Sequence, residues 1–146
     1  MTTTPCPLGA HCLTGALRPV ARLLTGSAYV VLGYGVLLEP GPPAREAAAL
    51  MAAIRDKVPL AATDEQVVMM NGAVQVACGA LLARGRLPRL SALILAGSMI
   101  PATLAAHRFW TVEDPVARKQ QRIQFFKNAA MVGGLLFAAL DYRGSK

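Results

Sequence analysis

Four long stretches with almost no charged residues constrain this chain more than any other feature of the sequence. They cover residues 20–38, 66–83, 90–106 and 124–140. A helix needs about 20 apolar residues to cross a bilayer, and backbone amides in lipid must be paired within the helix. The sequence therefore predicts four transmembrane helices packed as a bundle.

The composition agrees with a membrane location. The chain has 146 residues, of which 54% are hydrophobic and 16% are charged, so it is more apolar than an ordinary soluble domain of this size. Its net charge of +7 comes from cations at the ends of the apolar stretches, with no basic stripe interleaved with aromatic side chains. The expected partner is the lipid bilayer, and nucleic acid is excluded.

The chain divides into one domain and two short tails. Residues 1–17 and 142–146 are expected to be tails, the first of them flexible, and residues 18–141 to form the four-helix domain. Cys6 and Cys12 lie in the first tail and Cys78 lies in an apolar stretch, so free thiols are expected. Two cysteines and one histidine in the tail are too few ligands for a structural zinc site, and no metal site is predicted.

The two longer connectors carry the remaining structural signals. Residues 43–57 follow a proline-rich turn, and a helix there would place its Ala, Leu, Met and Ile side chains on lipid and its charged side chains in water. This predicts an interfacial helix, with a solvated connector as the alternative. The predicted fold is thus all-α: an integral membrane four-helix bundle with an amphipathic interfacial helix in the first connector. Small residues four apart, at which helices pack closely in lipid, occur in three stretches. They are Ala73 and Ala77, Ala92 and Ala96, and Ala130, Gly134 and Ala138.

The second long connector leads into the last helix. Asp114 suits an N-cap and Pro115 the first helical position, so a helix is expected from there to Leu140, about 26 residues or roughly 39 Å. Because the hydrocarbon layer is about 30 Å thick, its first turns must stand in water or headgroups. Four aromatic side chains are expected at the membrane surface, and three cations on the emergent turns form a candidate surface for docking a partner. The aromatic residues are Phe109, Trp110, Phe125 and Phe126, and the cations are Arg118, Lys119 and Arg122.

The distribution of cations bears on orientation. The tails and the short connector carry seven cations and the two longer connectors carry eight, but residues 84–89 alone hold three arginines in a short loop. This pattern favours a multi-pass protein of the bacterial cytoplasmic membrane with both termini in the cytoplasm. A cleaved signal peptide ending near Leu38 is the alternative for the first stretch, although the prolines that follow crowd the candidate cleavage site.

Several polar side chains are predicted to meet on the side of the two long connectors. Asn71 and Gln75 lie four apart inside the second span, His107 ends the third, and Lys127 and Asn128 begin the fourth. Polar groups at membrane depth usually face the bundle interior and mark a function, so these five residues form a candidate ligand pocket. Each also has a structural alternative. The amides can serve as contacts between helices, and His107 and Lys127 as anchors at the membrane surface.

The sequence has no phosphate-binding glycine loop, nucleophile elbow or metalloprotease motif.

Sequence motifs along the chain instead resemble those of one family. The segments that carry the resemblance are "EPGPPA" (39–44), "NGAVQVACGALLARGRLPRLSAL" (71–93), "HRFWTVEDP" (107–115) and "QFFKNAAMVGGLL" (124–136). By these motifs the chain resembles the DoxX family of small four-helix bacterial membrane proteins, of the actinobacterial type.

The resemblance implies redox work at the membrane. Some members resemble the small subunit of a thiosulfate:quinone oxidoreductase, and mycobacterial relatives are linked to a complex with superoxide dismutase and a sulfurtransferase in oxidative-stress resistance. We therefore expect an accessory subunit that anchors or assists a redox complex, rather than an enzyme. The alternative is a quinone-linked oxidoreductase subunit whose polar pocket binds a quinone or a sulfur species. Solute transport ranks last, because paired broken helices are missing from the sequence.

Overall fold

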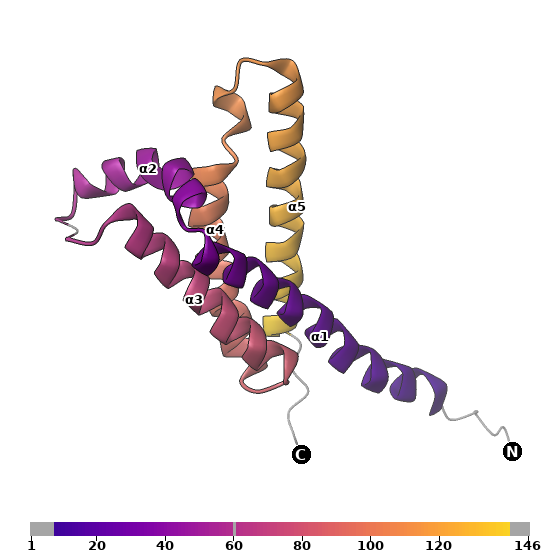
Figure 1. Cartoon of the computed structure of the whole chain (residues 1–146). Coiled ribbons are helices and arrows are strands. Elements are labelled where there is room, and N and C mark those ends of the chain that lie inside the picture. Colours follow the sequence, from indigo (N-terminus) through magenta and orange to yellow (C-terminus); the bar gives the residue numbers. More distant parts are fainter. Residues whose placement is uncertain (1–7, 60, 141–146) are drawn as a thin grey trace, which may run out of the picture.

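The computed structural model describes residues 8–59 and 61–140, and this part of the chain is helical without strands (Figure 1). Its elements are α1 (Leu8–Leu38), α2 (Gly41–Arg55), α3 (Asp64–Ala83), α4 (Pro88–Ala106), the 3-10 helix η1 (Phe109–Thr111) and α5 (Pro115–Leu140). Of these, α1, α3, α4 and α5 are long and apolar enough to cross a membrane, which confirms the predicted fold. The expected second tail, residues 142–146, lies outside the described residues, as does Cys6; α1 begins within the expected first tail.

The most extensive contacts between the spanning helices follow their order in the chain, and α1 and α5 also meet in the shared core. Helix α1 lies against α3, α3 against α4, and α4 against α5, while the first turns of α1 project beyond the other helices (Figure 1). Many apolar side chains face outward, among them Val31 (70% exposed), Met70 (67%) and Phe137 (79%). In water this surface would be a large apolar patch, but it suits the lipid environment that spanning helices imply.

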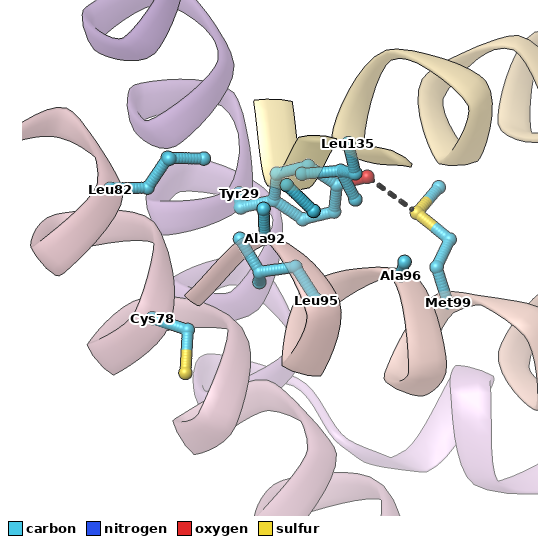
Figure 2. Packing of buried hydrophobic residues seen from close by; sticks show 9 residues of the cluster. Tyr29, Cys78, Leu82, Ala92, Leu95, Ala96, Met99 and Leu135 are labelled. Atoms are coloured by element: carbon cyan, nitrogen blue, oxygen red, sulfur yellow. Dashed lines mark hydrogen bonds between the residues drawn. The ribbon is translucent and has the colours of Figure 1, made fainter. Parts of the chain in front are cut away.

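The four spanning helices meet at one end of the bundle, in a core that Figure 2 shows from close by. Tyr29 of α1, Leu82 of α3, Leu95 of α4 and Leu135 of α5 are all fully buried there. The Tyr29 hydroxyl donates to Met99 Sδ over 2.9 Å, so this buried polar group has a partner (Figure 2).

Helices α1 and α3 approach each other most closely at two pairs of glycines. Gly26 faces Gly79 and Gly33 faces Gly72, so that the glycines on each helix are seven residues apart. A Cβ atom on Gly33 would lie 2.6 Å from the Gly72 carbonyl oxygen, and one on Gly79 would lie 2.7 Å from the Gly26 carbonyl oxygen. The two backbones can therefore pack at this distance only because these positions have no side chain.

The predicted amphipathic helix exists, but its apolar side does not lie on lipid as expected. Ala44, Ala47 and Met51 of α2 are buried, and the latter two pack with Ala105 of α4 and with partly buried side chains of α3. The sequence shows that α2 has an apolar side, but it does not show that α3 and α4 offer a surface to cover it. The exposed side of α2 carries Arg45 and several alanines.

Local chemistry fixes both ends of α3. Thr63 and Gln66 form a capping box, in which each side chain accepts a hydrogen bond from the backbone N–H of the other (3.2 and 3.0 Å). At the other end Gly85 adopts a φ of +68°, and Arg86 N–H donates to Leu81 O over 2.9 Å. This is the Schellman arrangement that glycine favours, and it turns the chain sharply into α4.

Candidate functional site

Hydrogen bonds tie the connector between α4 and α5 to the first turns of α5. Asp114 Oδ2 accepts a hydrogen bond from Ala117 N–H over 2.7 Å, as an N-cap does, and Pro115 begins the helix as predicted. Arg118 folds back onto the connector, donating from Nε to Val112 O (2.7 Å) and from a terminal nitrogen to Glu113 O (3.4 Å). The guanidinium of Arg118 therefore holds the connector against α5.

The four aromatic residues of this region form one cluster. Phe109 of η1 lies in edge contact with Trp110 and with Phe125 of α5, at ring-centroid distances of 5.2 and 5.5 Å. Phe125 also contacts Trp110 (6.0 Å) and Phe126 (5.7 Å). The four aromatic side chains expected at the membrane surface thus lie together, and their depth in the membrane stays a prediction.

An apolar groove of about 210 Å³ lies between α4 and α5, just inside this aromatic cluster. It is lined by Ile100, Thr103, Leu104, Phe125, Ala129 and Val132. Among these only Thr103 is polar, and its Oγ1 accepts a hydrogen bond from Asn128 Nδ2 over 3.2 Å. Thr103 is buried and Asn128 is half-buried, so the groove has apolar walls and one polar pair beside it.

A second polar pair links the same two helices. His107 Nδ1 lies 2.7 Å from Gln121 Oε1, an arrangement in which a protonated Nδ1 donates to the amide oxygen. Sequence reasoning named His107 and Asn128 but missed their partners, Gln121 and Thr103. The signal was spacing: Thr103 lies four residues before His107, which caps the end of α4, and Gln121 and Asn128 lie seven apart on one face of α5.

Asn71 and Gln75 lie in two other places. Asn71 lines a separate cavity of about 130 Å³ beneath α2, together with Ser98 and Pro101 of α4. Gln75 is buried in the contact with α1, and a Cβ added to Gly33 of α1 would lie 2.8 Å from the Cβ of Gln75. The two amides are one turn apart on α3, yet they meet different helices.

Lys127 is exposed, and it lines none of the cavities described above. Of the five predicted ligand-binding residues, Asn128 is the one beside the α4–α5 groove, and His107 contacts Gln121 of α5 at the end of α4. The structure therefore does not bring all five to one cavity, and their role in binding stays a prediction.

The cations predicted as a docking surface do lie together. Arg118, Lys119 and Arg122, with Pro115, surround a shallow hollow of about 180 Å³ on the first turns of α5. All three cations are exposed. Lys119 and Arg122 make no hydrogen bond or ion pair within the part of the chain that the structure describes. Their charges are therefore available to a partner.

Metal ligands do not gather in the described part of the chain: within residues 8–59 and 61–140 there is no group of three or more His, Cys, Asp or Glu side chains that could hold an ion. Cys78 is a buried free thiol. The site therefore offers charge, an apolar groove and hydrogen-bonding amides as its chemistry.

These features define a class of protein, a small multi-pass helical membrane protein with charged turns at the start of its last helix. The family model for DoxX matches residues 17–108, which is more than half of the chain. The chain belongs to the DoxX family. The match ends in the connector after α4, so α5 lies beyond the matched residues. No curated protein and no solved structure matches the chain.

Proposed function

We propose that this chain is an accessory membrane subunit that anchors or assists a membrane-associated redox complex. The observation that carries the proposal is the exposed cationic surface at the start of α5, where Lys119 and Arg122 lack partners within the described residues. Exposed charges of one sign attract a partner with an acidic surface and set its orientation. The redox setting, and a partner of the superoxide dismutase or sulfurtransferase type, come from the family resemblance.

The proposal includes the bacterial cytoplasmic membrane as location, with both termini cytoplasmic. It is supported by Arg84 and Arg86 of the short α3–α4 connector and by Arg89 in the first turn of α4, because short loops rich in arginine stay in the cytoplasm. Single cysteines at Lys57, which is exposed after α2, and at Ser145, in a thiol-free background, should then react from the outside and the inside of intact cells, respectively. Labelling of both from one side would contradict the four-span topology.

The anchoring role is tested first by native mass spectrometry of the protein extracted gently from its own membrane. We expect the chain within a larger assembly that contains a soluble redox enzyme. A monomer that carries a quinone and no protein would contradict the anchoring role and favour the second function below.

The docking surface is tested by a double substitution, Lys119→Gln with Arg122→Gln. Exposed charge pairs contribute about 0.5 kcal/mol each, so loss of two should weaken partner binding about fivefold. Arg118 is left unchanged, because its hydrogen bonds to Val112 O and Glu113 O hold the connector. Affinity for the purified partner enzyme, measured in low and high salt, is the readout.

The matched control is Arg84→Gln with Arg86→Gln, which removes two exposed arginines from the opposite end of the bundle. This control should bind the partner as the unaltered protein does. Equal weakening by both pairs would mean that net charge, rather than the start of α5, attracts the partner.

A second function, quinone binding, is favoured by the groove between α4 and α5. Its apolar walls suit an isoprenoid tail, and the Asn128 amide beside Thr103 suits a quinone carbonyl. The apolar lining favours a quinone over a small anionic sulfur species, since an anion would lose its hydration there. In this case the chain would be a quinone-binding subunit of an oxidoreductase.

A further inference from the structure

Another cavity lies between α1, α3 and α5, at the end of the bundle opposite the connector between α4 and α5. It measures about 260 Å³, and its lining includes Arg22 and Thr25 of α1, Leu82 of α3 and Phe137 of α5. Leu82 is fully buried at its base, whereas Phe137 is 79% exposed at its edge. The cavity therefore reaches from the lipid-facing surface into the bundle, with an arginine on its wall.

Cations gather at this end of the bundle. A Cβ on Gly85 would lie 3.7 Å from Arg22 Nη1, so the Arg22 guanidinium lies beside the α3–α4 turn. Arg84 and Arg86 flank Gly85 in this turn, and both are exposed. Three guanidinium groups from two separate segments thus belong to one end of the bundle.

No carboxylate of the described residues lies near these arginines. Seven of the eight acidic residues of the chain fall in residues 39–65 and 113–114, at the other end of the spanning helices, and the eighth, Asp141, lies outside the described residues. Arg22 is half-buried and makes no hydrogen bond or ion pair within residues 8–59 and 61–140. A half-buried arginine at the edge of the membrane is costly unless an anion pairs with it.

The depth of Arg22 fits the phosphate layer of one leaflet. Sixteen residues separate it from Leu38 at the other end of α1, or roughly 24 Å of helix at about 1.5 Å per residue. Because the hydrocarbon layer is about 30 Å thick and the side chain is long, the guanidinium reaches the headgroups. Basic pockets between transmembrane helices bind anionic headgroups in this way.

We infer that this cavity binds an anionic phospholipid, whose phosphate pairs with Arg22 and whose acyl chain enters between α1 and α5 past Phe137. Arg84 and Arg86 add attraction for the net negative charge of the headgroup. The site is independent of the proposed docking surface, since Lys119 and Arg122 lie at the opposite end of the bundle.

The test is native mass spectrometry of the full chain in detergent, titrated with phosphatidylglycerol or with phosphatidylcholine of the same acyl chains. Each cation near the surface favours an anionic lipid by a factor of about five. We expect phosphatidylglycerol to bind at least about fivefold more tightly. Arg22→Gln should remove most of this preference, Arg22→Lys should retain it, and Arg122→Gln at the other end should leave it unchanged.

Three outcomes would overturn the inference. Equal affinity for both lipids would show that the cavity does not select charge. A preference that persists in Arg22→Gln, in a variant that unfolds at the same temperature as the unaltered protein, would assign it to diffuse surface charge. Displacement of phosphatidylglycerol by an equal concentration of inorganic phosphate would make the ligand a free anion rather than a lipid.

Discussion

Replacing Gly33 by alanine should destabilise the protein by about 2 kcal/mol, because the added methyl group has no room between α1 and α3. Its Cβ would lie 2.6 Å from the Gly72 carbonyl oxygen, 2.8 Å from Gln75 Cβ and 3.0 Å from Val76 N. Two of these three atoms belong to the backbone, so a side-chain rotation cannot relieve the contact. The helices must separate instead, and the other glycine pair, Gly26 with Gly79, would lose its contact as well.

The control for this substitution lies two residues further along the same helix. A Cβ on Gly35 would meet no atom within 4 Å, and alanine favours a helix over glycine by up to about 1 kcal/mol. Gly35→Ala should therefore leave the stability unchanged or raise it. Gly72→Ala, whose Cβ would lie 3.0 Å from the Gly33 carbonyl oxygen, should give an intermediate loss.

The free energy of unfolding in mixed detergent micelles, followed by far-UV circular dichroism, provides the measurement. The order of stability should be Gly35→Ala, then Gly72→Ala, then Gly33→Ala. If Gly33→Ala and Gly35→Ala had equal stability, the two helices would not be held together at the glycine pairs.

The number and approximate ends of the spanning helices were predictable, because lipid excludes charge and the connectors collect it. The start of α5 at Pro115 was also predictable, since Asp114 and Pro115 each act locally. Local chemistry of this kind does not depend on how the helices pack, and it can be read directly from the sequence.

The inward-facing sides of the helices were much harder to predict. In a soluble helix the apolar side shows which way it faces, whereas a transmembrane helix is apolar all round. The two alanines four apart in α4, Ala92 and Ala96, are buried, but those in α3, Ala73 and Ala77, are exposed. The close contact with α1 instead uses Gly72 and Gly79, which are seven residues apart. Small residues four apart do not indicate this spacing.

The residue types of the candidate site could be predicted, but the positions of those residues in the fold could be predicted only in part. Asn71 and Gln75 share a face of α3 to within one turn, yet α2 covers the first and α1 the second. The position of α2 over α3 and α4 could not be read from its amphipathic pattern. By contrast, the cations of α5 lie together because they are spaced along one helix, so that prediction needed no tertiary contact.

Quinone binding in the groove between α4 and α5 should fall about tenfold or more when Ala129 is replaced by phenylalanine. Ala129 lines the groove, so the new ring would occupy much of its volume of about 210 Å³. Ala130, the next residue, is also exposed but does not line the groove. Ala130→Phe therefore adds the same apolar bulk to α5 and should leave binding unchanged.

The chain provides its own probe for this measurement. Trp110 is its single tryptophan, and its ring lies 6.0 Å from that of Phe125, which lines the groove. A quinone bound there should quench the tryptophan fluorescence in a saturable way in lipid nanodiscs. Saturable quenching that is equal in Ala129→Phe and Ala130→Phe would place the quinone elsewhere, and quenching that never saturates would leave the groove without a ligand of this class.

The polar end of the groove distinguishes a bound headgroup from a tail that merely occupies apolar space. Asn128 has two N–H donors and one carbonyl oxygen, and only one donor is used by Thr103. A quinone carbonyl can accept the second, which adds about 1 kcal/mol in a site shielded from water. Asn128→Leu should then weaken quinone binding about fivefold, while leaving the affinity for a tail without a quinone ring unchanged. Equal losses for both ligands would mean that Asn128 shapes the groove without contacting the headgroup.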